Sequence, residues 1–216
     1  MLHILRITVL KFTICRRFRM RELTNVEEKI LDKALYLIGK IGSFNVPIRA
    51  IAKEANVNVS AVNYYFRTKD EMLRHVKEFY IDNTIAAYSI LDSDEYNDKE
   101  KVILSANEIM EYTLKYPGIL TILKEAMDKK DISEVDAKIV EVTNAMNEKL
   151  DKTLDNVLNQ NDIMFQYNKM IFLSSILYPT INYDFKNFDN SVLDSKDERL
   201  KYITYIIDRL KSCSND

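Results

Sequence analysis

The fold of this chain is decided by residues 48–67, whose sequence is IRAIAKEANVNVSAVNYYFR. Two short amphipathic stretches flank a polar break, a pattern typical of a helix-turn-helix. Helices that cross steeply need a small residue at their contact, which Ala52 supplies. The break needs a residue that tolerates left-handed backbone angles, which Asn56 does, and Asn58 can cap the second helix. The side chains expected to face the common core are Ile51, Ala55, Val57, Val62 and Tyr65.

The rest of the chain predicts long helices and an all-α fold. Only three glycines and three prolines occur in 216 residues, whereas strand-rich folds need frequent turn residues. We expect a first helix over residues 24–41, ended by Gly42, and the helix-turn-helix over about 47–55 and 59–66. Apolar periodicity then predicts helices near 69–91, 98–115, 117–128, 133–160, 163–178 and 194–212, with Pro179 ending the fifth of these.

Charge is distributed unevenly along the chain. Residues 1–75 carry 14 Lys and Arg against 7 Asp and Glu, and the remainder carries 17 against 26, which suits a nucleic-acid-binding end on an acidic body. We expect a basic segment 1–20, a helix-turn-helix domain 21–68, and a helical ligand-sensing and dimerisation domain 69–216. The basic segment is either a DNA-contacting arm or a start assigned upstream of Met20. The second interpretation is preferred, because the folded pattern begins at Arg21.

The helix-turn-helix continues into a stretch that matches a known family. Residues 62–66 end the second helix in aromatics, and residues 68–73, Thr-Lys-Asp-Glu-Met-Leu, follow directly. Together with the turn at 55–58, this stretch resembles the TetR/AcrR family of bacterial repressors over about residues 24–73. The remainder agrees with the family in helical content and length but not in residues.

The chain departs from the family pattern at four places. The usual turn glycine is Asn56, and the usual capping serine is Asn58. Residues 46–47, Val-Pro, replace a Thr or Ser that in relatives often touches phosphate. The aromatic residue that often precedes position 64 is Asn63, which bears on the choice of bases.

The resemblance implies that the second helix of the motif enters the major groove of double-stranded DNA. Asn63 then reads adenine through its two-pronged amide, and Val59 packs on a thymine methyl group. Tyr65 and Thr68 donate to phosphate, although Tyr65 fits the core equally well. The full set of expected DNA-contacting residues is Arg49, Asn58, Val59, Ser60, Asn63, Tyr64, Tyr65, Thr68 and Lys69.

The resemblance also implies that the body forms a homodimer and binds a small-molecule inducer. Two heads on a homodimer would read a palindromic DNA sequence. The dimer seam, meaning the contact surface between the two subunits, is expected on the last two helices. Its expected residues are Met170, Phe172, Leu173, Ile176, Leu177, Ile203, Ile207 and Leu210. The expected lining of an inducer pocket is Met110, Tyr112, Leu114, Ile119, Leu123, Met127 and Met146. Both sets have a plainer interpretation as intramolecular core. That is the commoner role of methionines and tyrosines such as those of the pocket set, whereas dimerisation is the preferred interpretation of the seam set.

The expected function is therefore a cytoplasmic repressor that a small-molecule inducer releases from DNA, with no cofactor, no metal and no membrane partner. The sequence contains no Gly-rich phosphate loop and no nucleophile-and-base set, which disfavours an enzyme. Its two histidines and two cysteines are isolated from one another, which disfavours a metal site. Two rivals stay open: a helical interaction protein with a vestigial head, and a DNA-binding factor that senses no ligand.

Overall fold

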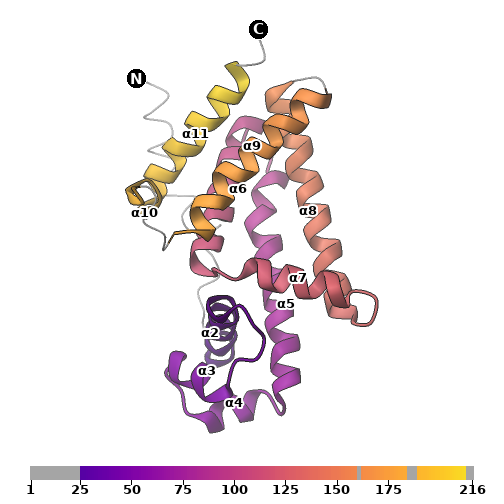
Figure 1. Ribbon diagram of the computed structural model, residues 1–216, viewed down its shortest axis with the longest axis vertical. Helices are drawn as coiled ribbons and strands as arrows, with labels where there is room; N and C mark the ends of the chain where they lie inside the picture. Colours follow the sequence, from indigo (N-terminus) through magenta and orange to yellow (C-terminus); the bar gives the residue numbers. More distant parts are fainter. Residues whose placement is uncertain (1–24, 160–161, 184–188, 213–216) are drawn as a thin grey trace.

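The computed structural model describes residues 25–159, 162–183 and 189–212, and every regular element in these ranges is helical. The expected all-α fold is confirmed. A small head consists of α2 (Val26–Ile41), α3 (Ile48–Glu54) and α4 (Val59–Tyr65) (Figure 1). The elements of the larger body are α5 (Lys69–Tyr88), the 3₁₀-helix η1 (Ser89–Asp92), α6 (Asp98–Lys115), α7 (Ile119–Lys129), α8 (Glu134–Leu158), α9 (Asp162–Ile181), α10 (Ser191–Asp194) and α11 (Lys196–Ser212).

The corners of the head follow from single residues. Asn25 begins α2 by accepting a hydrogen bond at 2.8 Å from the backbone N–H of Glu28. Gly42 ends α2 with a φ of 69°, which a residue without a Cβ adopts at little cost. Asn56 takes a φ of 54° in the turn between α3 and α4, as its side chain permits. Local chemistry therefore fixes where the helices of the head begin and end.

The head shares its apolar core with the lower part of the body. Met72 and Val76 of α5 are fully buried in the same cluster as Ile30 and Leu35 of α2. α7 lies across the base of the body beside the head (Figure 1), and its Ile122 belongs to this cluster. The sequence boundary expected after residue 68 thus falls at the start of α5 but inside a continuous core.

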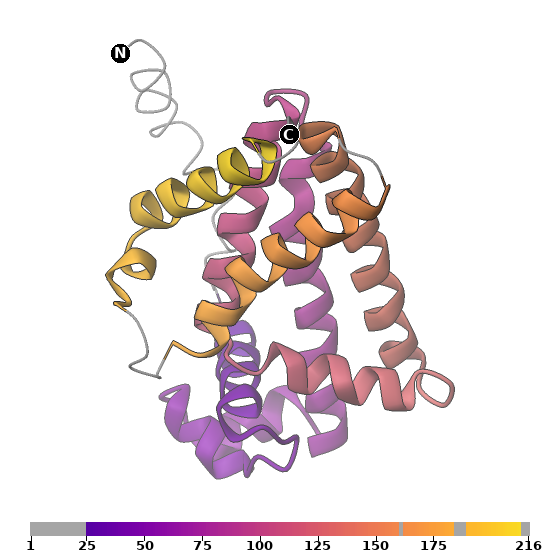
Figure 2. The ribbon, with the colours of Figure 1, turned by 45° about the horizontal axis from the view of Figure 1, so that its top comes forward.

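A second core fills the far end of the body, between α6, α8, α9 and α11. Phe172 and Ile176 of α9 are fully buried there together with Ile203 and Ile207 of α11. α9 crosses the other body helices obliquely, with α11 on one side of it and α8 on the other (Figure 2). The outer face of α9 is therefore the side that these neighbours leave uncovered.

The expectation that Pro179 ends its helix is wrong, because α9 continues through it to Ile181. A proline lacks the N–H that would otherwise donate to the carbonyl four residues earlier, here that of Ser175. The hydroxyl of Tyr202 in α11 donates to this carbonyl at 2.9 Å instead. A tertiary hydrogen bond thus satisfies the acceptor that the proline leaves open, and the helix can continue.

Candidate nucleic-acid interface

Helix α4 is held by its buried face and by its cap. Val62 and Phe66, one turn apart, are both buried in the core of the head. Asn58 begins the helix, and its Oδ1 accepts hydrogen bonds at 2.7 Å from the Ala61 backbone N–H and from the Ser60 hydroxyl. Because Oδ1 has two donors already, Asn58 acts by orienting α4 and the Ser60 side chain.

The opposite face of α4 carries the residues expected to read bases. Tyr64 is 82% exposed, and Val59, Ser60 and Asn63 are exposed as well. Tyr65 is expected either in the core or at DNA. Its side chain is exposed, so the expectation that it packs in the core is wrong. The aromatic in the core is Phe66 instead, because it lies four residues after Val62 and hence on the same side.

Three further expected residues flank α4. Arg49 on α3 and Thr68 at the start of α5 are exposed or nearly so. Thr68 Oγ1 accepts from the Glu71 backbone N–H at 3.0 Å, which leaves its hydroxyl proton for a second acceptor. Lys69 Nζ donates to Asn45 Oδ1 at 3.3 Å, a contact between segments 24 residues apart. Sequence patterns give no sign of Asn45, because its role in placing Lys69 depends on that long-range contact.

The head matches the family model "Bacterial regulatory proteins, tetR family" over residues 30–76. Residues 30–76 thus form a DNA-binding head of the TetR family. This is a family of transcriptional regulators, not of enzymes. Residues 30–76 include the buried stripe of α2, the whole helix-turn-helix and the first turns of α5.

Two curated proteins are similar to this chain over short stretches. The probable HTH-type transcriptional regulator YttP of Bacillus subtilis (strain 168) is 39% identical over 57 residues, which cover 26% of this chain and 28% of that protein. An uncharacterized HTH-type transcriptional regulator in the dhlA 5' region of Xanthobacter autotrophicus is 41% identical over 46 residues, 21% of this chain and 23% of that protein. The chain therefore matches only about a quarter of the length of these relatives.

Solved TetR-family structures resemble nearly the whole chain in fold. A TetR family transcriptional regulator PfmR from Thermus thermophilus has a TM-score of 0.55 at 17% identity, covering 85% of this chain and 97% of that one. A putative TetR-family regulator from Rhodococcus sp. has a TM-score of 0.54 at 12% identity, covering 86% and 98%. At such low identity the likeness concerns the fold alone. Within the described ranges, no helix is long and apolar enough to cross a membrane.

Six of the seven residues expected to line an inducer pocket divide between the two cores. Four of them pack in the core shared with the head: Tyr112, Ile119, Leu123 and Met146. Two pack in the second core: Met110 and Leu114. Met127 is 53% exposed on α7, so its side chain faces solvent. The four residues of the first group come from α6, α7 and α8, where these helices approach the head.

Most residues expected at the dimer seam lie inside the chain's own core. Five are at most 6% exposed and so offer no surface to a second subunit in this conformation: Phe172, Ile176, Ile203, Ile207 and Leu210. Leu173 and Leu177 are half-buried against the same core, and Met170 is 67% exposed. Apolar periodicity marks a face that is covered, but it does not tell whether the cover comes from the same chain or from another.

A buried carboxylate joins the head to the body. Asp32 of α2 accepts a hydrogen bond from the hydroxyl of Tyr116, which follows α6, and lies 2.9 Å from Lys115 Nζ. Burial by itself raises the pKa of Asp32, but the hydrogen bonds from Tyr116 and Lys115 and the charges of Lys115 and Lys33 bring it below its ordinary value. Asp32 is therefore held ionised as a fixed anchor between α2 and the end of α6.

A second contact between head and body consists of two glycines. Gly39 of α2 and Gly118, just before α7, meet backbone to backbone, so that a Cβ on Gly118 would lie 1.7 Å from the Cα of Gly39. Two of the three glycines in the chain thus serve one close approach. Their lack of side chains allows α7 to lie directly on α2.

A third contact is the buried ion pair of Lys77 in α5 and Asp136 in α8. Lys77 Nζ lies 2.7 Å from Oδ1 and 2.8 Å from Oδ2 of Asp136, and 3.5 Å from Glu125 of α7. The same ammonium lies 5.1 Å from the ring centroid of Phe44, in the loop between α2 and α3. One side chain therefore connects three body helices with the head.

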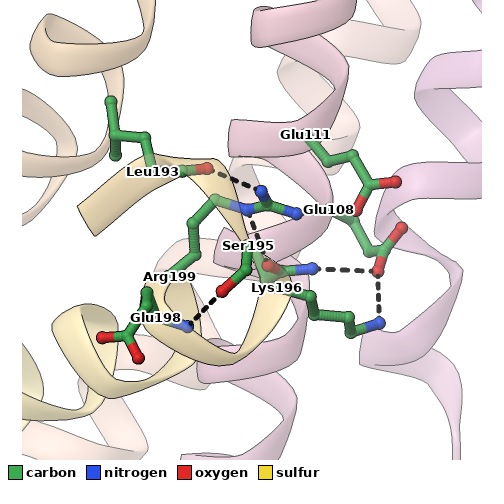
Figure 3. Close-up of polar contacts among 8 residues, drawn as sticks. Glu108, Glu111, Leu193, Ser195, Lys196, Glu198 and Arg199 are labelled. Carbon is green, nitrogen blue, oxygen red and sulfur yellow. Dashed lines mark hydrogen bonds and ion pairs between the residues drawn. The ribbon is translucent and has the colours of Figure 1, made fainter. Parts of the chain in front are cut away.

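Far from the head, a buried arginine ties the last helix to α6 (Figure 3). Arg199 donates to Asn107 Oδ1 at 3.1 Å, to the Leu193 carbonyl at 2.8 Å and to Glu111 Oε2 at 3.0 Å. Its three nitrogens are all engaged within the chain. We therefore regard this network as structural, since it fixes α10 and α11 on the body.

Proposed function

We propose that this chain is a cytoplasmic repressor that binds palindromic operator DNA as a homodimer and is released by a small-molecule inducer. The outward face of α4 carries the proposal, because Ser60, Asn63 and Tyr64 are exposed while Val62 and Phe66 hold the helix from behind. A short helix presented in this way fits the major groove. Lys69, at the start of α5, adds a positive charge beside backbone amides that attract phosphate.

Asn63→Ala is expected to weaken binding to preferred DNA by about 5- to 150-fold, because one bidentate base contact is worth roughly 1–3 kcal/mol. The preferred DNA is first selected from a random duplex pool with the unaltered chain, and affinities are then measured by fluorescence anisotropy. Asn144→Ala, at an exposed asparagine of α8, is the matched control and should bind like the parent. If Asn63→Ala and Asn144→Ala bind equally well, α4 is not the reading helix.

The dimer surface that we propose is the outer face of α9. Five large apolar side chains of this helix are exposed: Ile163, Tyr167, Met170, Ile171 and Tyr178. Their spacing of three, four and seven residues places them along one side of the helix. An apolar stripe of this length on a single subunit indicates a protein interface. Of the residues expected from the sequence, Met170 is the one that lies on this stripe.

Ile171→Asp is expected to raise the dimer dissociation constant at least about a hundredfold, because each subunit would bury an unpaired carboxylate in an apolar interface. Ile132→Asp is the matched control, since Ile132 is 85% exposed in the turn between α7 and α8. Sedimentation equilibrium of the three proteins measures the effect. An Ile171→Asp protein that dimerises as tightly as the control would place the interface elsewhere.

The inducer part of the proposal is supported by the position of the three head-to-body contacts. In the head, Asp32 contacts the end of α6, Gly39 contacts the turn between α6 and α7, and Phe44 contacts α5. A ligand that binds better to a conformation with displaced α6 and α7 would shift the heads and lower operator affinity. Four of the expected pocket residues pack in this same core.

A further inference from the structure

The side-chain amide of Asn58 has only one orientation that fits its neighbours. Its oxygen Oδ1 lies 2.7 Å from the Ala61 backbone nitrogen, and an amide nitrogen in that place could not accept the Ala61 proton. The Ser60 hydroxyl oxygen lies 2.7 Å from the same Oδ1. Because Oδ1 carries no hydrogen, the proton between these two oxygens belongs to Ser60. The Ser60 hydroxyl therefore donates to Asn58 before any partner binds.

This internal bond leaves Ser60 with a single role toward an outside molecule. A serine hydroxyl ordinarily donates or accepts, because its one proton rotates to suit the partner. Here the proton points back at Asn58, so Ser60 Oγ offers only lone pairs. Ser60 is exposed in the first turn of α4, and its three-residue spacing from Asn63 places both on the outward side. The outward face of α4 thus carries an oxygen that accepts but does not donate.

We propose that Ser60 is a specificity-determining residue that selects adenine or cytosine at one position in each half of the palindrome. In the major groove adenine N6 and cytosine N4 carry a free N–H, whereas guanine and thymine present only acceptors. An oxygen that can only accept gains a hydrogen bond from the first two bases and meets lone pairs on the other two. The inference rests on the proposed function, in which this face of α4 enters the major groove.

The base preferences of the parent and of Ser60→Ala provide the first measurement. Duplexes are selected from a random pool with each protein and sequenced. At one position per half the parent should bind adenine or cytosine about 2- to 12-fold more tightly than guanine or thymine, the effect of a single neutral hydrogen bond. Ser60→Ala should lose this preference alone. Ser191→Ala, at an exposed serine of α10, is the matched control and should select the same DNA as the parent.

Modified bases at that position identify the group that Ser60 contacts. N6-methyladenine and N4-methylcytosine keep the Watson–Crick pair but replace the free amino hydrogen in the major groove by a methyl group. They should weaken binding of the parent at least about twofold and leave Ser60→Ala unaffected. 7-Deazaadenine lacks the N7 acceptor and should bind the parent as well as adenine does, because Ser60 has no proton to give to N7.

Variants of Asn58 test whether the held proton decides the choice of base. Asn58→Gly removes the acceptor, and glycine is well tolerated at the start of a helix. The released Ser60 hydroxyl can then donate as well, so guanine or thymine should be admitted at the same position and at no other. Asn58→Asp keeps the acceptor and should keep the preference, while its negative charge lowers the affinity for all duplexes alike. Asn58 is in this sense a positioning residue.

Three results would overturn the assignment of Ser60. They are a parent preference for guanine or thymine at the position that Ser60→Ala alters, base preferences that Ser60→Ala leaves unchanged, and an Asn58→Gly protein that still rejects guanine and thymine. Each of them leaves the proposed repressor intact if Asn63→Ala weakens binding as expected. A parent chain that selects no DNA from the pool would instead overturn the proposed function, and the role of Ser60 with it.

Discussion

Gly118→Ala is expected to lower the melting temperature by roughly 6–12 °C and to weaken DNA binding at the same time. The added Cβ would lie 1.7 Å from the Cα of Gly39 and under 3 Å from its backbone N and C. These are main-chain atoms, so no side-chain rotation relieves the overlap and α7 must move away from α2. Overpacking of this kind costs about 3 kcal/mol. The displaced α7 would carry the head to a different position on the body.

Gly42→Ala separates loss of stability from displacement of the head. Gly42 has a φ of +69° with open space around it, so an alanine there is strained by about 1–2 kcal/mol but pushes nothing aside. Its melting temperature should fall, while its affinity for selected DNA at room temperature should equal that of the parent. Calorimetry and anisotropy on both variants make the comparison. If Gly118→Ala melted and bound like the parent, the two glycines could not be in the contact described.

The starts of α2, α4 and α5 can be predicted from the sequence because the hydrogen bonds that cap them are local. Asn25, Asn58 and Thr68 each cap the helix that follows them, and each bond spans only three residues. The outward face of α4 is predictable for a related reason, because the apolar positions of a seven-residue helix leave only one side for polar ones. Local pattern therefore predicts the head and its exposed surface well.

Contacts between distant segments explain what the sequence did not predict. The helix continues past Pro179 because Tyr202, 23 residues later, donates to the carbonyl that the proline leaves open. The pairing of Gly39 with Gly118 joins positions with no common periodicity. Phe172 and Ile203 were expected between subunits, but they lie in the second core, since an apolar stripe does not specify its partner. In each case the missing information is the identity of the neighbour.

Lys77→Met is expected to destabilise the chain by about 3–5 kcal/mol, the cost of leaving a buried charge without its partner. The abandoned carboxylate of Asp136 is only 1% exposed, and both of its oxygens lie within 2.8 Å of the Lys77 ammonium in the parent. Lys129→Met is the matched control. Lys129 also lies near Glu125, at 2.9 Å, but is half exposed, so its loss should cost about 0–1 kcal/mol. Urea unfolding followed by circular dichroism measures both.

The double variant Lys77→Met with Asp136→Leu distinguishes the pair from its surroundings. Replacing both partners of a buried ion pair by apolar residues is often neutral or stabilising, so the double variant should recover most of the stability lost by Lys77→Met. Glu125 keeps its contact with Lys129 in that variant. The contact of Lys77 with Phe44 would still be missing, so DNA affinity should stay below that of the parent even where stability returns. If stability and affinity recovered together, Lys77 would serve the fold alone and would play no part in placing the head.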